Sequence, residues 1–149
     1  MKKTPHTLVL LAVLASSAAL YFGTGMQPIW WLAWIVPIPL LLLASRASIS
    51  WTFAAATLAC TIGNLNEWHY LHKVIEIPLI PTLLITILPG LIFGGCILLY
   101  RYFLRTSMWR AALIFPSSWV VYEFVSESLS PHSTAGNIGY SQMHFLPIL

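Results

Sequence analysis

Long apolar runs with very few charges constrain the fold of this chain more than any other feature of its sequence. Only 7% of the 149 residues are charged and 58% are hydrophobic, whereas a soluble domain carries about 25% charged residues. A soluble fold of this size could not cover its surface with so few charges. The sequence therefore predicts a membrane protein built from transmembrane helices.

The apolar runs predict an all-α, polytopic transmembrane helix bundle in which residues 1–149 form a single membrane domain. We expect about five complete spans, and a further apolar run at residues 143–149 looks like the start of a sixth. A natural membrane protein rarely ends inside such a run, so we expect a truncated chain. The predicted spans are residues 8–22, 29–44, 49–65, 80–102 and 111–127.

The first apolar run has two interpretations. Lys2 and Lys3 precede it and small residues lie at positions 15–19, a pattern that is typical of a secretory signal peptide. The run is long for a signal peptide, however, and further apolar runs follow at once. We expect it to stay in the chain as the first span, with cleavage as the alternative.

Basic residues at the ends of the apolar runs predict the topology. With a cytoplasmic N-terminus, the outside segments hold only Lys73, as the positive-inside rule requires. Because the basic residues are scattered, the net charge of +3 does not indicate a nucleic-acid partner. The inside segments would hold Lys2, Lys3, Arg46, Arg101, Arg105 and Arg110.

Residues 115–142 form the one stretch where polar side chains gather without a run of charge. The stretch begins as an apolar helix with Glu123 and Glu127 one turn apart, breaks at Ser130 and Pro131, and continues as a short polar loop. An ionisable group inside a span is costly and usually has a functional or packing role. Glu123 either faces the bundle interior, hydrogen-bonded or protonated, or lies near the interface beside Glu127 on a tilted helix.

The chain offers no convincing catalytic constellation. Several serines lie in this polar stretch, but the sequence has no G-x-S-x-G turn and no Asp to complete a usual triad. Cys60 and Cys96 lie inside apolar runs without a partner base, so we interpret them as structural residues. We therefore expect no catalytic residue and no cofactor in this chain.

His69 and His72 could form a metal site, because their i, i+3 spacing beside Glu67 can place them on one helical face. The spacing is not H-E-x-x-H, and no other Cys or His stands at a defined ligand spacing. The favoured interpretation is a collar of Trp, Tyr and His at the end of a span. We therefore expect no metal.

The stretch 115–142 resembles the membrane domain of bacterial apolipoprotein N-acyltransferase. That family has a span with Pro, Trp and Glu, and then a loop that ends in Asn-(apolar)-Gly-Tyr-Ser-Gln. The chain matches it, in order, at Pro116, Trp119, Glu123, Asn137, Gly139, Tyr140, Ser141 and Gln142. The resemblance implies that these are structural residues of the family, with Glu123 bonded toward the loop and the loop residues capping helix ends.

Earlier segments are also similar to that family, and some positions depart from it. Trp34 followed by Pro37 and Pro39 looks like its second span, and Gly63 followed by Trp68 looks like the end of its third. The family often has an Arg two residues after the matched Glu, where this chain has Val125. It often has Phe-Pro-Trp before the Asn, where this chain has Ser-Thr-Ala-Gly at 133–136. Together with Ser-Pro-His at 130–132, these departures suggest a divergent branch.

The resemblance implies a location in the bacterial inner membrane and transfer of an acyl chain from a membrane phospholipid to the N-terminal cysteine amine of a diacylated lipoprotein. The family's chemistry belongs to a periplasmic nitrilase-like domain with a Glu-Lys-Cys triad and a thioester intermediate. No triad residue can be assigned here, so we expect that domain to be absent from this chain and the chain alone to be inactive. The alternative is a complete small membrane scaffold or transporter subunit without catalysis.

Overall fold

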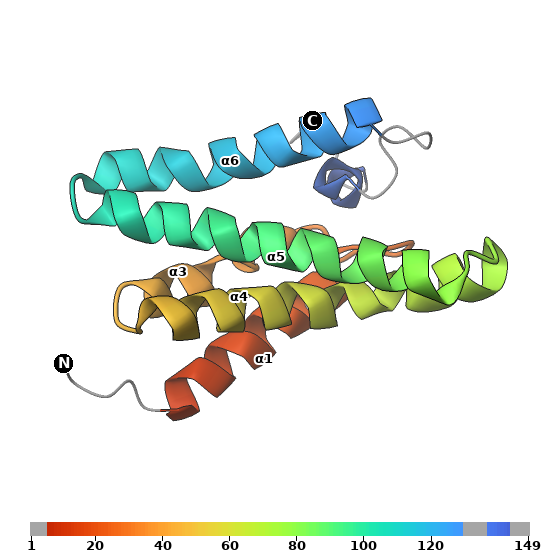
Figure 1. The fold of residues 1–149 in the computed structure, drawn as a ribbon, viewed down its shortest axis with the longest axis horizontal. Coiled ribbons are helices and arrows are strands. Elements are labelled where there is room, and N and C mark those ends of the chain that lie inside the picture. Colours follow the sequence, from red (N-terminus) through yellow and green to blue (C-terminus); the bar gives the residue numbers. More distant parts are fainter. Residues whose placement is uncertain (1–5, 130–136, 144–149) are drawn as a thin grey trace.

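The computed structural model describes residues 6–129 and 137–143, and this part of the chain consists of helices without a β-strand (Figure 1). The all-α prediction is therefore confirmed for the described residues. The long helices are α1 (His6–Gly23), α4 (Ile49–Gly63), α5 (Leu79–Leu104) and α6 (Met108–Leu129). The short elements are α2 (Leu32–Ile35), α3 (Ile38–Ala44), η1 (Asn64–Glu67), η2 (Tyr70–Val74) and η3 (Ile138–Gln142).

Some predictions fall outside the described residues. These are the basic start at Lys2 and Lys3, the loop at 130–136 with its departures from the family pattern, and most of the predicted sixth span, at 144–149. Four predicted spans correspond closely to α1, α4, α5 and α6.

The long helices pack side by side, with α4 between α1 and α5, and α5 between α4 and α6 (Figure 1). Small side chains line the contacts that α1 and α4 make with the core. They allow helix axes to approach closely where no water is present to drive hydrophobic association. The buried small residues on the two helices include Ala12, Ser16 and Ala19 on α1, and Ala55, Ala56 and Ala59 on α4.

Glycines bring α5 close to α4. A Cβ on Gly90 would lie 2.4 Å from Thr61 Oγ1 and 2.9 Å from the carbonyl oxygen of Thr57, and a Cβ on Gly94 would lie 2.6 Å from Thr57 Oγ1. Both glycines are buried. The Gly90–Gly94 pair is thus a close helix contact in the structure.

The predicted span 29–44 does not run as one helix. It is divided into α2 and α3, with a turn at Val36 and Pro37 between them. Pro37 and Pro39 lack the amide hydrogens that would bond to Ala33 and Ile35 in a continuous helix. Pro37 instead serves as the N-cap of α3, where a missing donor costs little.

Two of the described helices, α1 and α5, are long and apolar enough to cross a membrane. With 26 residues, α5 is about 39 Å long, which exceeds the roughly 30 Å of a bilayer's hydrocarbon core. Helix α4 has only 15 residues, and α6 carries Arg110, Glu123 and Glu127. The count of five spans therefore stays a prediction.

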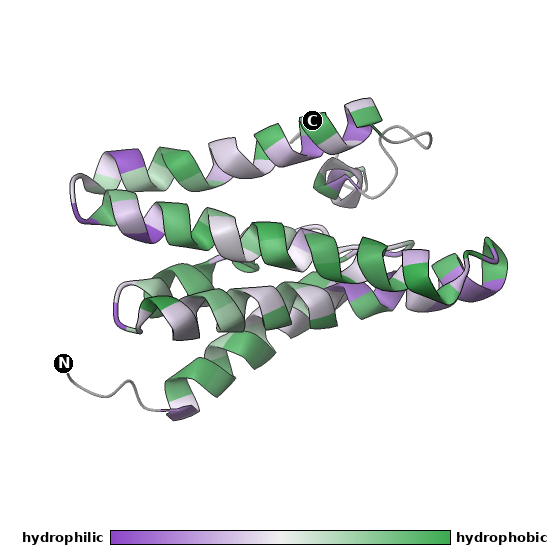
Figure 2. Cartoon of the chain, in the orientation of Figure 1, coloured by the Kyte–Doolittle hydropathy of each residue, from purple (hydrophilic) through white to green (hydrophobic). Residues whose placement is uncertain are grey.

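The charged residues of the long helices and their connections lie toward the two ends of the bundle, which can be followed along the chain in Figures 1 and 2. The α3–α4 turn and the α5–α6 turn lie together at one end, which we name the basic end. Its arginines are Arg46, Arg101, Arg105 and Arg110. At the other end, which we name the polar end, Glu67 lies in η1, Glu76 lies between η2 and α5, and Glu123 and Glu127 lie in the last turns of α6.

Candidate functional site

Residues 137–143 fold into a compact turn at the polar end. Asn137 is the N-cap of η3, and its Oδ1 accepts a 2.7 Å hydrogen bond from the backbone N–H of Gly139. The Ser141 hydroxyl donates a 2.7 Å bond to the carbonyl of Ile138. Asn is a favoured N-cap because its short side chain can satisfy a backbone donor of the first turn. Local sequence therefore determines the shape of this segment.

Two glutamates of α6 hold the start of this turn. Glu123 Oε1 accepts a 2.9 Å hydrogen bond from the backbone N–H of Ile138, and Glu127 Oε1 accepts a 2.6 Å bond from Asn137 Nδ2. The glutamates are four residues apart, so they project from one face of the helix. Both side chains are partly buried, and hydrogen bonds to a carboxylate are among the stronger kind. The turn is thereby fastened to α6.

Gln142 fastens the other end of the turn to α2 and to the residues just before it. Its Oε1 accepts a 3.0 Å hydrogen bond from the indole N–H of Trp34. Its Nε2 donates to the carbonyl of Trp30 at 3.1 Å and to Ser141 Oγ at 2.7 Å. The side chain is only 7% exposed, and a buried amide requires such partners. Gln142 thus joins parts of the chain that lie far apart in sequence.

An aromatic cluster supports this site from within the bundle. The ring of Trp119 lies edge to face against Phe93 of α5, with centroids 5.4 Å apart, and 4.9 Å from the ring of Tyr122. Phe93 also contacts Phe115 edge to face at 5.7 Å. Such arrangements are favourable beyond the area they bury. They fix the rotation of α6 and hence the direction in which Glu123 points.

The predicted family residues therefore come from two elements. Trp119 and Glu123 lie on α6, and the others lie in the turn or at its N-cap: Asn137, Gly139, Tyr140, Ser141 and Gln142. The Tyr140 side chain is 47% exposed, whereas Ser141 and Gln142 are buried. The sequence reasoning assigned no site role to Glu127 or Trp30, and it gave Trp34 no partner. Of these three residues, only Glu127 had a signal in the sequence, namely its i, i+4 spacing from Glu123.

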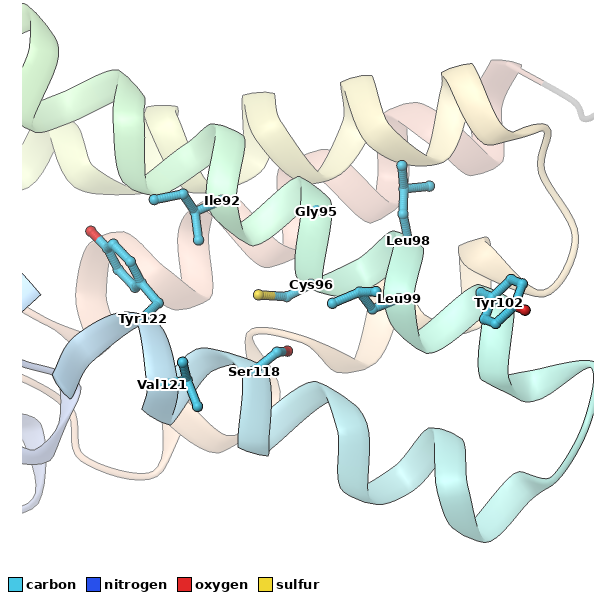
Figure 3. A pocket seen from close by; sticks show the side chains of 9 residues that line it. All are labelled: Ile92, Gly95, Cys96, Leu98, Leu99, Tyr102, Ser118, Val121 and Tyr122. Carbon is cyan, nitrogen blue, oxygen red and sulfur yellow. The ribbon is translucent and has the colours of Figure 1, made fainter. Parts of the chain in front are cut away.

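An open apolar groove of about 690 Å³ runs between α5 and α6 (Figure 3). Its polar groups are few, since only the side chains of Cys96, Ser118, Tyr102 and Tyr122 interrupt an aliphatic lining. Gly95 contributes no side chain, and a Cβ there would meet no atom within 4 Å. The groove can accept a flexible apolar chain.

Within the described residues, neither Cys60 nor Cys96 has the surroundings of a catalytic cysteine. Cys60 and Cys96 are both free thiols and both buried. The Sγ of Cys60 accepts a 3.8 Å hydrogen bond from Asn64 Nδ2, a contact that involves no base. A nucleophilic cysteine needs a lowered pKa and access to its substrate.

The histidines lie in the turn between α4 and α5. His72 Nδ1 is 3.1 Å from the carbonyl oxygen of Ile77, and its ring lies 6.1 Å from that of Trp68. His69 is exposed. Within residues 6–129 and 137–143, no three His, Cys, Asp or Glu side chains gather where they could hold a metal ion. Burial raises the pKa of the nearby Glu67 carboxyl above its ordinary value.

Comparison with known proteins gives one match. The family model described as the apolipoprotein N-acyltransferase N-terminal domain matches residues 16–149. The resemblance inferred from residues 115–142 is thereby confirmed and extends over most of the chain. No curated protein and no solved structure is significantly similar to the chain.

Proposed function

The chain belongs to the apolipoprotein N-acyltransferase N-terminal domain family, and we propose that it is the membrane portion of an enzyme that acylates lipoproteins. In this proposal the enzyme transfers an acyl chain from a membrane phospholipid to the N-terminal cysteine amine of a diacylated lipoprotein. The residues that react belong to a nitrilase-like domain outside this chain. The family match favours this function over a scaffold or transporter subunit.

The observation that carries the proposed role is the double attachment of residues 137–143. Glu123 and Glu127 hold the start of the turn on α6, and Gln142 holds its end against Trp30 and Trp34. A segment held at both ends presents Tyr140 in a fixed place at the polar end of the bundle. Such preorganisation suits a surface on which a catalytic domain has to sit in one position. The chain therefore acts as anchor and platform.

The groove of Figure 3 supports a second part of this role. Its apolar lining suits one acyl chain of a phospholipid, because burial of an acyl chain among apolar side chains is favourable. Tyr122 lies at the end of the groove lining nearest Glu123, so a lipid in the groove would point toward the polar end. The proposed donor thus reaches the platform from within the membrane.

A chimera tests this function. Residues 1–149 replace the matching part of an active family member in bacteria depleted of their own enzyme, and mass spectrometry measures the acylation of lipoprotein N-terminal peptides. We expect the chimera to produce triacylated peptides and the 149-residue chain alone to leave them diacylated.

Two outcomes contradict the proposal. Triacylated product from the chain alone would show that the reacting groups lie within it. A chimera that inserts into the membrane and folds, yet leaves the lipoproteins diacylated, would show that this chain does not act as a platform for the catalytic domain.

A further inference from the structure

Among the described residues of the basic end, Arg105 and Arg110 are exposed arginines. Arg105 is the C-cap of α5 and follows Arg101 by one helical turn, so the two residues lie on the same side of that helix end. Arg110 lies in the first turn of α6. The chain has four acidic side chains in all. The one nearest along α6, Glu123, lies 13 residues beyond Arg110, about 20 Å along the helix. No ion pair within the described residues neutralises Arg105 or Arg110.

Arg101 has a separate structural role. Its Nη1 donates hydrogen bonds to the carbonyl oxygens of Ala44 and Ala47, which belong to the C-terminal end of α3 and the following turn. These bonds hold the α3–α4 turn against the end of α5. The side chains of Arg105 and Arg110, by contrast, are exposed, so their guanidinium groups are available to an anion from outside the chain.

A second groove lies beside Arg110. It has a volume of about 260 Å³ and is lined by Phe103, Arg110, Leu113, Ile114 and Ser117. Arg110 is its only charged residue, and Phe103, Leu113 and Ile114 form its apolar walls. The groove follows α6 from Arg110 toward Ser117, two turns further into the bundle.

We propose that the basic end binds an anionic phospholipid, with its phosphate at Arg105 and Arg110 and one acyl chain in the groove beside Phe103 and Ile114. A free phosphate would use only the arginines and would leave the groove empty, whereas an amphiphilic anion matches both. Arginines at the ends of apolar helices lie at the level of lipid headgroups, where anionic lipids attract them. The site depends on the chain being a membrane domain and not on acyl transfer.

Native mass spectrometry of the full chain in neutral detergent tests the proposal. We expect phosphatidylglycerol to be retained about tenfold more strongly than phosphatidylcholine with the same acyl chains. Raising sodium chloride from about 0.05 M to about 0.5 M should weaken this preference in the unchanged chain, because salt screens exposed charges. Equal retention of both lipids at low salt would overturn the proposal.

Variants locate the site. The double variant Arg105→Gln and Arg110→Gln should lose the preference, whereas Lys73→Gln, at the exposed cation of the polar end, should keep it. Ile114→Trp should fill the groove and lower phosphatidylglycerol retention while all charges stay in place. Circular dichroism confirms that each variant is folded, and the salt series needs no variant.

Glycerol 3-phosphate distinguishes a lipid from a free anion. We expect it to show no saturable binding at lipid concentrations that fill the site. If it binds as tightly as phosphatidylglycerol and Ile114→Trp changes nothing, the site is a simple anion site and the proposal is wrong. Retention that is unchanged in the double arginine variant would also overturn it.

Discussion

The side-chain amide of Gln142 accepts a 3.0 Å hydrogen bond from the indole N–H of Trp34, although 108 positions of sequence separate the two residues. The same amide donates to the carbonyl of Trp30. The start of the second predicted span, residues 29–44, is thus tied to the turn that follows α6. The family's Gly-Tyr-Ser-Gln motif ends in the residue that makes this connection.

The Gln142–Trp34 pair should be energetically coupled. Gln142→Leu should lower the free energy of unfolding by about 1–3 kcal/mol, because it removes the partly buried hydrogen bonds to Trp34 and Trp30. Trp34→Phe removes the indole N–H, keeps a smaller aromatic ring at a largely exposed position, and should cost less. In a double-mutant cycle measured by denaturation in mixed micelles, we expect a coupling energy of about 0.5–1.5 kcal/mol. Trp31→Phe combined with Gln142→Leu is the control, and coupling as large in that pair would argue against a specific bond.

Glu123 should control the order of residues 137–143 through its acceptor oxygen. Glu123→Gln keeps an oxygen that can accept from the Ile138 N–H, whereas Glu123→Leu removes it. We expect hydrogen–deuterium exchange at the Ile138 amide to rise in the Leu variant and to change little in the Gln variant. Val120→Leu, at an exposed position one turn earlier on α6, is the control. Equal protection in all three variants would mean that the bond does not hold the turn.

Apolar runs were sufficient to predict the long helices, because helices that pack among apolar surroundings need few other signals. The positions of α1, α4, α5 and α6 followed from run length alone. The division at Val36 and Pro37 was harder, because prolines in a span can either kink a helix or end it. The partners of Gln142 could not be predicted, since hydrogen bonds between distant segments leave no periodicity in the sequence.

The stability of the chain should depend on pH through Glu67. Burial raises the pKa of this carboxyl in the folded chain above its ordinary value, so the folded state binds the proton more tightly than the unfolded state. Stability is therefore greatest below the ordinary pKa of a glutamic acid and falls as pH rises toward the raised value. In this pH range, Glu67→Gln should make the thermal unfolding temperature, measured in detergent, depend less on pH. Glu76→Gln, at an exposed position, controls for the loss of one negative charge. If Glu67→Gln leaves the slope of unfolding temperature against pH unchanged, Glu67 is not the cause of the pH dependence.

Two adjacent glycines of α5 should respond in opposite ways to the same substitution. A Cβ at Gly94 would lie 2.6 Å from Thr57 Oγ1 and 2.9 Å from the ring of Phe53, so Gly94→Ala requires these side chains or the two helices to shift. Overpacking of this kind typically costs about 1–3 kcal/mol. A Cβ at Gly95 would meet no atom within 4 Å, and Gly95→Ala should be neutral or should stabilise α5 by up to about 1 kcal/mol, the gain in helix propensity. Unfolding of both variants in the same mixed micelles measures the difference. Because the substitutions are chemically identical and one position apart, equal destabilisation would show that the α4–α5 contact is not as close as the structure has it.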